Sequence, residues 1–536
     1  MIPMSDATVP ETPVRPSDVI RFVLDGAVRT LHDVPPTRTV LQMLREDLGR
    51  TGTKEGCAEG DCGACTVVLV ETDGETGDEL RCRAVNSCIQ FVPTLDGKAL
   101  VTVEDLKGPR GTLHPVQAAM VDCHGSQCGF CTPGFVMSLF ASYKSVRAPD
   151  RAALSDALAG NLCRCTGYRP ILDAGVAMGR LADAVPADQH DWISAPYGLR
   201  TERVAATEQA LVAMLKSIAR STQASFGHAN GQFFAPHTLA ELTSIRAALP
   251  DARLLAGGTD VGLWVTKQHR DLGDLIYTGT VAELKRIETT STHLEIGAAV
   301  TLSDVMRPLA THFPDFRELL RRYGSPPIRH AATLGGNIAN GSPIGDSMPA
   351  LIVLGATVVL RASDTTREMP LEDFYLGYQK TVLGRGEFVE RIRIPLPEAA
   401  LAFRTYKISK RFDQDISALC GAFAARIVNG RIGSIRIAFG GMAATAARAR
   451  ATEAALLDQP WTEATVRIAQ AALETDYAPI SDMRASATYR RTVAGNLLKK
   501  FFIETNARVS RHPSRLYDLR DLRDLRNEGN VGDVPV

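Results

Sequence analysis

The chain has 536 residues, of which 45% are hydrophobic and 22% charged, and its 60 basic and 60 acidic residues give a formal net charge of zero. This length exceeds the size at which one hydrophobic core keeps growing, so we expect several domains. The neutral balance gives no electrostatic bias toward nucleic acids or anionic membranes, which argues against a DNA-binding protein.

The amino-terminal segment lacks the basic region and apolar core of a secretory signal, and the sequence has no run of 18 apolar residues. We therefore expect a cytoplasmic protein. In a reducing compartment, clustered cysteines are better explained as metal ligands or redox groups than as disulfides. Ten of the eleven cysteines lie within residues 57–165 and only Cys420 lies outside, so at least two kinds of domain are expected.

Residues 17–106 predict a small β-grasp-like domain of sheet and helix. Two short strands flank an Asp-Gly turn within 19–34, helical spacing follows at 39–48, and further strands are predicted at 66–72, 80–86 and 99–106. Alternating apolar residues Ile20, Phe22 and Leu24 would place one face of the first strand in the core.

Cys57, Cys62 and Cys65 have C-x4-C-x2-C spacing in a glycine-rich loop, which favours a [2Fe–2S] centre. The glycines let the backbone wrap closely and point amides at sulfur. The fourth thiolate has two candidates. Cys82 sits in an alternating strand and should face the apolar side, whereas Cys88 follows an Asn-Ser turn and is the better candidate. A zinc knuckle normally uses paired C-x2-C units, so it fits this spacing poorly.

A second group of cysteines occupies residues 107–185, where we expect a helical domain. Its four candidate ligands are Cys128, Cys131, Cys163 and Cys165. Each pair precedes a proline at a predicted helix start, so helix amides and the positive end of the helix dipole would face the thiolates. Cys123 is interpreted as a buried spare thiol.

Residues 186–228 are weakly patterned and predict a linker with one helix, and a new domain is expected over 229–398. Within 252–267 an apolar strand runs into two adjacent glycines and then an amphipathic helix. Such glycines let backbone amides approach a phosphate, although a simple tight turn uses them too. A second segment, 328–356, is too polar for a strand and too rich in glycine for a helix, and suits the lining of a nucleotide site.

Residues 400–510 alternate predicted strands and helices and form the last globular segment. Residues 511–536 repeat Asp-Leu-Arg, which fits no helical stripe and predicts a solvated charged tail.

The segments GCAEGDCGACTV, GSQCGFCTPG and GNLCRCTGYRPI resemble the iron–sulfur half of the xanthine dehydrogenase and aldehyde oxidoreductase family of molybdenum hydroxylases. The resemblance implies a plant-type ferredoxin domain and a helical domain, each with one [2Fe–2S] cluster. The tract AVNSC matches the family's fourth-ligand tract, which implies Cys88. The family also implies that Gln127 and Cys165 face the pterin of a molybdenum cofactor on a partner chain.

The two glycine segments resemble the halves of the FAD site in the vanillyl-alcohol-oxidase (PCMH-type) flavin fold, and the G-x-G-x-x-G fingerprint is missing from the sequence. Residues 400–510 resemble the carboxy-terminal domain of carbon monoxide dehydrogenase flavoproteins, and the implied fold class is multidomain α+β. The resemblance implies that the following residues bind FAD: Leu254, Leu255, Ala256, Gly257, Gly258, Thr259, Asp260, Val261, Tyr323, Thr333, Asn337, Asp346, Val389 and Lys407.

The sequence after position 510 is too short for a molybdenum domain, so the resemblance implies a large partner subunit, in a heterotetramer of two small and two large chains. Electrons would pass from molybdenum through the helical-domain cluster and the ferredoxin-type cluster to FAD and then NAD+, during oxidation of hypoxanthine and xanthine to urate. No residue of this chain is expected to be catalytic in the hydroxylation. The alternatives are another molybdenum hydroxylase, acting on an aldehyde or N-heterocycle, and a zinc-stapled scaffold without enzymatic activity.

Overall fold

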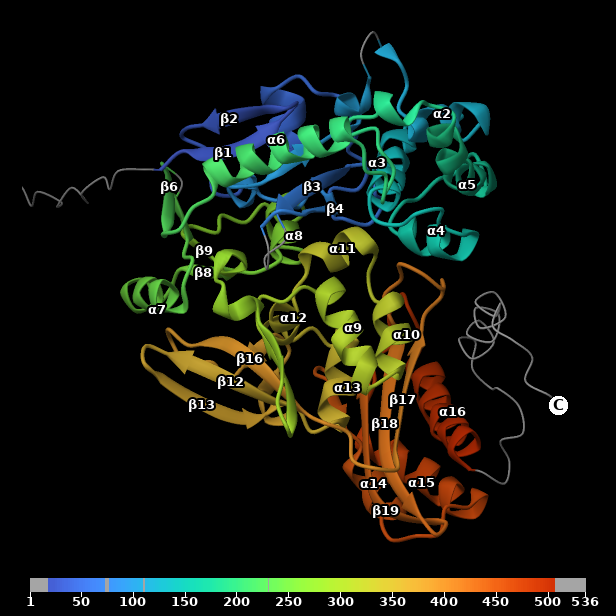
Figure 1. Ribbon diagram of the computed structural model, residues 1–536. Helices are drawn as coiled ribbons and strands as arrows, with labels where there is room; N and C mark the ends of the chain where they lie inside the picture. Colours follow the sequence, from blue (N-terminus) through green and yellow to red (C-terminus); the bar gives the residue numbers. More distant parts are fainter. Residues whose placement is uncertain (1–17, 73–76, 109–110, 230, 507–536) are drawn as a thin grey trace, which may run out of the picture.

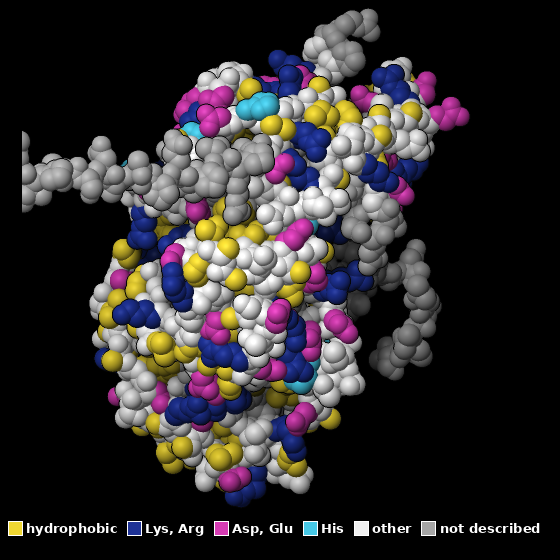
Figure 2. Space-filling view, turned by 90° about the vertical axis from the view of Figure 1, so that its left-hand side faces the viewer, with side chains coloured by type: hydrophobic (Ala, Val, Ile, Leu, Met, Phe, Trp, Pro, Cys, Tyr) yellow, Lys and Arg dark blue, Asp and Glu magenta, His cyan; other side chains and the backbone are white. Residues whose placement is uncertain are grey.

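A computed structural model describes residues 18–72, 77–108, 111–229 and 231–506. The amino-terminal third forms an upper tier, a central lobe lies beneath it, and the carboxy-terminal segment extends downward beside that lobe (Figure 1). On the face shown in Figure 2, basic and acidic side chains are interspersed. None of the helices in the described ranges is long and apolar enough to cross a membrane. The expected charged tail, 511–536, lies outside the described residues.

The first domain is a mixed sheet with strand order β2-β1-β5-β3-β4 and a short helix. Its elements are β1 (Ile20–Leu24), β2 (Ala27–Leu31), α1 (Val40–Gln42), a π-helical turn (Met43–Asp47), β3 (Thr66–Thr72), β4 (Leu80–Asn86) and β5 (Ala99–Val101). Asp25 and Gly26 have φ values of 55° and 66°, the left-handed conformation that a two-residue hairpin turn needs. This confirms the predicted β-grasp-like arrangement, with Ile20, Phe22 and Leu24 buried.

A four-helix domain packs against the face of this sheet opposite Ile20, Phe22 and Leu24. Its helices are α2 (Pro115–Asp122), α3 (Thr132–Tyr143), α4 (Arg151–Ala157) and α5 (Arg169–Asp183). Phe135 and Leu139 of α3 share one apolar core with Val68 and Val70 of β3, so the two domains of the upper tier form a single packed unit.

The segment expected as a linker contributes to both neighbours. Its helix, α6 (Glu202–Ile218), lies across the first sheet, where Leu215 and Ile218 join the core beneath it (Figure 1). Its last five residues form a strand, β6 (Ala224–His228), which pairs with the next strand of the central lobe. The alternation of Ala224 and Phe226, both buried, explains this strand.

The central lobe contains two sheets, with orders β6-β7-β9-β8 and β10-β11-β16-β12-β13, and a hairpin, β14-β15. Its further strands are β7 (Gly231–Ala235), β8 (Arg253–Leu255), β9 (Leu275–Tyr277), β10 (Ile287–Thr289), β11 (His293–Gly297), β12 (Thr357–Ala362), β13 (Thr365–Pro370), β14 (Tyr375–Gly377), β15 (Lys380–Thr381) and β16 (Phe388–Pro395). Its helices are α7 (Leu239–Ala248), α8 (Val261–Thr266), α9 (Leu302–His312), α10 (Asp315–Arg321), α11 (Pro326–Ala331), α12 (Leu334–Asn340) and α13 (Ser347–Val353).

The expectation that residues 328–356 are too rich in glycine for a helix is wrong, because this segment contains α12 and α13 as well as the end of α11. Thr333 caps α12 by accepting a hydrogen bond from the Gly336 amide (2.9 Å). A Cβ on Gly335 would lie 2.5 Å from the Ala298 Cα, so the close packing of this helix requires a glycine. Tertiary packing therefore overrides the low helix propensity of glycine here.

The carboxy-terminal domain is a four-stranded sheet, β17-β18-β19-β20, backed by helices. Its elements are β17 (Leu401–Ile408), β18 (Leu419–Val428), β19 (Arg431–Gly440), β20 (Ala447–Arg448), α14 (Arg450–Leu456), α15 (Glu463–Asp476) and α16 (Ala487–Thr505). Phe423 and Phe439 of the sheet pack against Phe501 of α16 in its core. The predicted alternation of strands and helices in this segment is wrong, because four strands come first and three helices follow them. The multidomain α+β fold class is confirmed.

Candidate redox-cofactor sites

Three thiols of the loop before β3 lie together with one thiol that follows β4. We call these four residues the first cysteine group: Cys57, Cys62, Cys65 and Cys88. The Sγ atoms of Cys65 and Cys88 lie 3.3 Å apart and both residues are buried. The Cys57 Sγ accepts hydrogen bonds from the amides of Asp61 (3.3 Å) and Cys62 (3.3 Å). Gly60 has a φ of 77°, which lets the loop turn these amides toward the sulfur.

Cys82, the alternative fourth thiol, lies apart from this group. Its side chain on β4 packs against the core shared with the helical domain. Burial in this core raises the pKa of the Cys82 thiol to about 12, because an apolar environment disfavours the thiolate.

The second cysteine group consists of Cys128, Cys131, Cys163 and Cys165. The Sγ atoms of Cys128 and Cys165 lie 3.5 Å apart, and both residues are exposed. Cys131 is the residue before α3, so the start of that helix faces the group. Its neighbour Gln127 is exposed on the same loop. Cys123, expected to be a buried spare, is half-buried at the end of α2, where it packs against the core.

The donor sets suit [2Fe–2S] clusters. In each group the thiols lie in pairs, and two thiolates on each of two irons complete such a cluster. Thiolates are also the ligands that soft metal centres select. Among the described residues, no set of three or more His, Cys, Asp or Glu side chains is arranged to hold a single metal ion.

The backbone ties the two cysteine groups together. The Leu162 amide, next to Cys163, donates a hydrogen bond of 3.0 Å to the carbonyl of Cys62. The Asn161 Nδ2 donates to the Gly63 carbonyl at 3.1 Å. A Cβ on Gly134 of α3 would lie 2.1 Å from that same carbonyl, so only glycine allows α3 to approach the loop.

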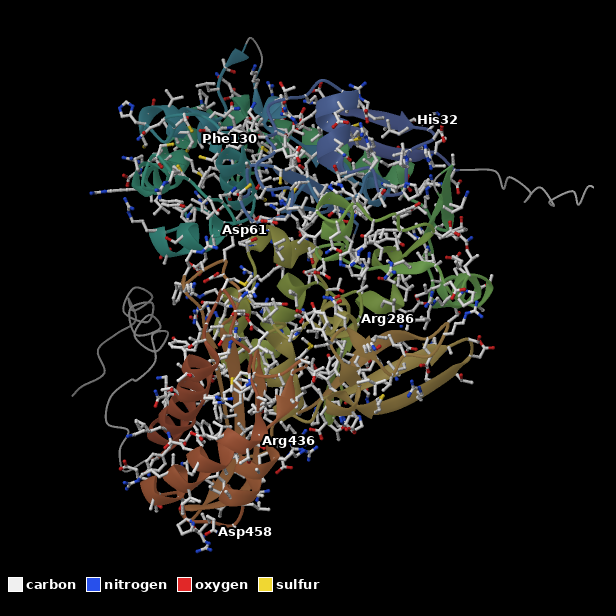
Figure 3. All side chains as sticks on the ribbon, turned by 180° about the vertical axis from the view of Figure 1, so that it is seen from behind. His32, Asp61, Phe130, Arg286, Arg436 and Asp458 are labelled. Carbon is white, nitrogen blue, oxygen red and sulfur yellow. The ribbon has the colours of Figure 1, made fainter. Side chains whose placement is uncertain are left out.

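A cavity of about 810 Å³ lies between the upper tier and the central lobe, and the first cysteine loop forms one of its walls through Glu59, Gly60 and Asp61. Asp61 lies where the two parts of the molecule meet (Figure 3). The predicted FAD residues that line this cavity are Leu254, Ala256, Gly257, Gly258, Thr259, Asp260, Val261, Tyr323, Thr333, Asn337, Val389 and Lys407. They come from distant parts of the sequence, and the fold brings them to one space.

Two predicted FAD residues do not line the cavity. The Leu255 side chain is buried in the core beneath the first sheet. Asp346 is buried behind Lys407, with its Oδ2 2.6 Å from the Lys407 Nζ. The Ser417 hydroxyl donates to the other carboxylate oxygen (2.7 Å) and accepts from the Lys407 Nζ (2.8 Å). Asp346 therefore fixes the lysine, and Lys407 presents its side chain to the cavity.

A second set of hydrogen bonds joins Asn337, Tyr323 and Ser347. The Asn337 Nδ2 donates to the Tyr323 hydroxyl at 2.6 Å, and the Asn337 Oδ1 accepts from the Ser347 hydroxyl at 2.5 Å. Burial raises the pKa of Tyr323, so its phenol remains protonated. The amide of Asn337 is thus fixed in orientation before any ligand binds.

The glycine turn after β8 is shaped for close approach. Gly258 has a φ of 72°, and a Cβ on Gly257 would lie 2.0 Å from the Ala331 carbonyl oxygen. Both observations exclude other residues at this turn without rearrangement. The cavity volume lies in the range of natural ligand sites, and its mixture of glycine backbone, amide, hydroxyl and ammonium groups fits a dinucleotide such as FAD.

Several residues that line the cavity lie outside the predicted FAD set. Arg253 and Arg270 stack over the Trp264 ring, with guanidinium carbons 4.7 and 5.3 Å from its centroid. Burial and the neighbouring Arg270 lower the pKa of Arg253. Gln414, on the loop between β17 and β18, lies at the wall next to Asp61.

Four stretches of the chain match known families. Residues 22–92 match a 2Fe-2S iron-sulfur cluster binding domain and residues 102–175 a [2Fe-2S] binding domain. Residues 226–397 match the FAD binding domain in molybdopterin dehydrogenase, and residues 404–505 match the CO dehydrogenase flavoprotein C-terminal domain.

Similar curated proteins carry xanthine dehydrogenase names. The chain is 32% identical to xanthine dehydrogenase of Emericella nidulans, over 93% of this chain and 39% of that protein. It is 29% identical to xanthine dehydrogenase 1 of Arabidopsis thaliana, over 92% of this chain and 40% of that protein. The chain thus spans about two fifths of the length of these relatives.

Among solved structures, carbon monoxide dehydrogenase from Hydrogenophaga pseudoflava is 30% identical, over 50% of this chain and 94% of that chain, with a TM-score of 0.48. The four family matches follow one another without overlap over most of the sequence. Together the four domains identify the chain as the iron–sulfur and FAD-binding part of a molybdenum hydroxylase.

Proposed function

We propose that this chain is the electron-transfer subunit of a xanthine dehydrogenase. In this proposal it takes electrons from a molybdenum cofactor on a large partner subunit and passes them through two [2Fe–2S] clusters to FAD and then to NAD+. The partner oxidises hypoxanthine and xanthine to urate. The names of the curated relatives support the choice of substrate.

The observation that carries the proposal is the order of the three sites. The second cysteine group lies at the surface, through the exposed Cys128 and Cys165. The Leu162 amide joins it to the carbonyl of Cys62 in the first group. The first cysteine loop in turn forms a wall of the cavity. This order supports a route for electrons between the surface and the cavity.

In this arrangement each residue has a defined role. The eight thiolates hold the clusters, and loop amides such as that of Asp61 stabilise the negative charge on sulfur. Lys407 and Asn337 orient the flavin in the cavity. Bound FAD supplies a centre that accepts electrons one at a time and delivers two together.

We place the large partner subunit at the surface around the second cysteine group. Gln127 and Cys165 lie at the surface there, and Phe130 beside them leaves 48% of its area exposed (Figure 3). An exposed aromatic next to exposed thiols suits a protein interface. We propose a heterotetramer of two small and two large chains. All eleven cysteines are free thiols, which suits the cytoplasm.

Purification of the native complex tests the proposal. We expect a second, larger polypeptide with molybdenum, four irons and one FAD per copy of this chain, and reduction of NAD+ when hypoxanthine or xanthine is added. Activity on an aldehyde or N-heterocycle, with none on purines, would assign the chain to another molybdenum hydroxylase. A colourless zinc protein would refute the redox function.

A further inference from the structure

Gln414 connects the first cysteine loop to the cavity wall. Its side-chain Nε2 donates a hydrogen bond to the carbonyl oxygen of Asp61, across 353 positions of sequence. That carbonyl only accepts hydrogen bonds, so the amide must turn its nitrogen toward Asp61 and keep its oxygen for another partner. Gln414 is 7% exposed and also lines the cavity.

The Oε1 of Gln414 is buried and has no hydrogen-bond partner among the described residues. A buried acceptor without a partner has lost its hydrogen bond to water, so a ligand donor that reaches it is favoured. FAD carries ring N–H groups that could serve as this donor. Gln414 therefore has one end occupied by the cysteine loop and one end ready for a ligand.

The same contacts form a continuous route from sulfur to cavity. The Asp61 amide donates to the Cys57 Sγ at 3.3 Å, and the Asp61 carbonyl accepts from Gln414. The backbone of Asp61 and one side-chain amide thus connect a cluster ligand to the cavity wall.

The loop that carries Gln414 is held in place by arginine. Arg322 donates to the carbonyls of Lys407 (3.0 Å) and Phe412 (3.2 Å) and stacks on the Phe412 ring, 4.4 Å from its centroid. Gln414 itself has a φ of 49°, a conformation that a glutamine keeps only where its surroundings require it. The loop is therefore positioned before a ligand arrives.

We infer that Gln414 is the positioning residue that joins the ferredoxin-type cluster to the flavin, with Nε2 bound to the cysteine loop and Oε1 accepting a hydrogen bond from FAD. This inference rests on the proposed function. Each transfer along the route oxidises the cluster by one electron and reduces the flavin by one electron. Two transfers, with protons taken from solvent, complete the reduction of FAD.

The test uses the full chain loaded with both clusters and FAD. A radiolytic pulse supplies single electrons, and absorbance follows their movement from cluster to flavin. In Gln414→Leu we expect a slower transfer and an FAD affinity about tenfold weaker, the effect of one lost hydrogen bond. The matched control is Gln209→Leu, because Gln209 is exposed on α6 and is not among the described residues that line the cavity.

A second variant separates position from charge. In Gln414→Glu the ionised carboxylate cannot donate to Asp61, so transfer should slow, and its negative charge should lower the midpoint potential of the flavin. Cluster and FAD contents equal to wild type establish that the variants fold. An unchanged transfer rate in Gln414→Leu, or an unchanged flavin potential in Gln414→Glu, overturns the inference. A wild-type chain without clusters or FAD refutes instead the proposed function.

Discussion

The buried ion pair between Lys407 and Asp346 gives the strongest prediction about stability. The two side chains are 2% and 1% exposed, and Nζ and Oδ2 are 2.6 Å apart. In Lys407→Met the carboxylate stays buried with only the Ser417 hydroxyl as its hydrogen-bond donor. Removal of one partner from a buried pair costs about 3–5 kcal/mol, because the other charge remains in a low-dielectric site.

For a domain of about 150–250 residues, each kcal/mol lost from the free energy of unfolding lowers the melting temperature by about 2–4 °C. The Lys407→Met variant should therefore melt about 6–20 °C lower than the wild type. The measurement is thermal unfolding followed by circular dichroism on protein stripped of FAD, so that loss of the ligand does not contribute. Lys410→Met, at an exposed lysine three positions later, is the control and should change stability by about 0.5 kcal/mol or less.

The double variant Lys407→Met with Asp346→Asn should recover part of the loss, since a neutral amide still pairs with the Ser417 hydroxyl. A melting temperature in Lys407→Met that matches the Lys410→Met control would show that the pair contributes nothing to stability, and the reasoning from its burial would be refuted.

Three further predictions concern the first cysteine group and the stability of the upper tier. Cys88→Ser should remove one cluster from the iron content and visible spectrum, whereas Cys82→Ser should keep both; the reverse result would exchange their roles. Burial lowers the pKa of His114 to about 4, below its unfolded value of 6.5. Its neutral side chain therefore contributes its full stability above pH 6.5, and this stability is lost as the pH falls from 6.5 toward 4. Between about pH 7.5 and 5.5 this loss is about 1 kcal/mol, and His114→Asn, which retains a capping side chain, should abolish it in denaturant titrations. Gly134→Ala should destabilise the upper tier by about 1–3 kcal/mol, while Gly179→Ala, at a helix position with open space around it, should be neutral or stabilising; equal melting temperatures would contradict the close-packing argument.

The cysteine loop could be predicted because its chemistry is local. Its spacing and glycines lie within a few residues, and alternation along one strand was enough to assign Cys82 to the core. The glycine turn after β8 is equally local. The helix at Gly335 could not be predicted, because its stability comes from contact with Ala298 on a separate element.

The resemblance named Lys407 and Asp346, but the contact that joins them could not be predicted from the residue pattern. A lysine in an ordinary strand is usually exposed, yet Lys407 is buried because the fold supplies Asp346 from another segment. The contact between Gln414 and Asp61 likewise depends on how two domains meet. Sequence patterns report periodicity along one element, whereas these contacts report the arrangement of several.

The helix α6 has a consequence for the rate at which electrons move within this chain. It closes over one face of the first sheet while the helical domain occupies its own share of that core. A free ferredoxin reaches its partners by diffusion, so its rates depend on its concentration. Here the ferredoxin-type domain is locked to both neighbours, so transfer within the chain should proceed at the same rate in dilute and in concentrated solution.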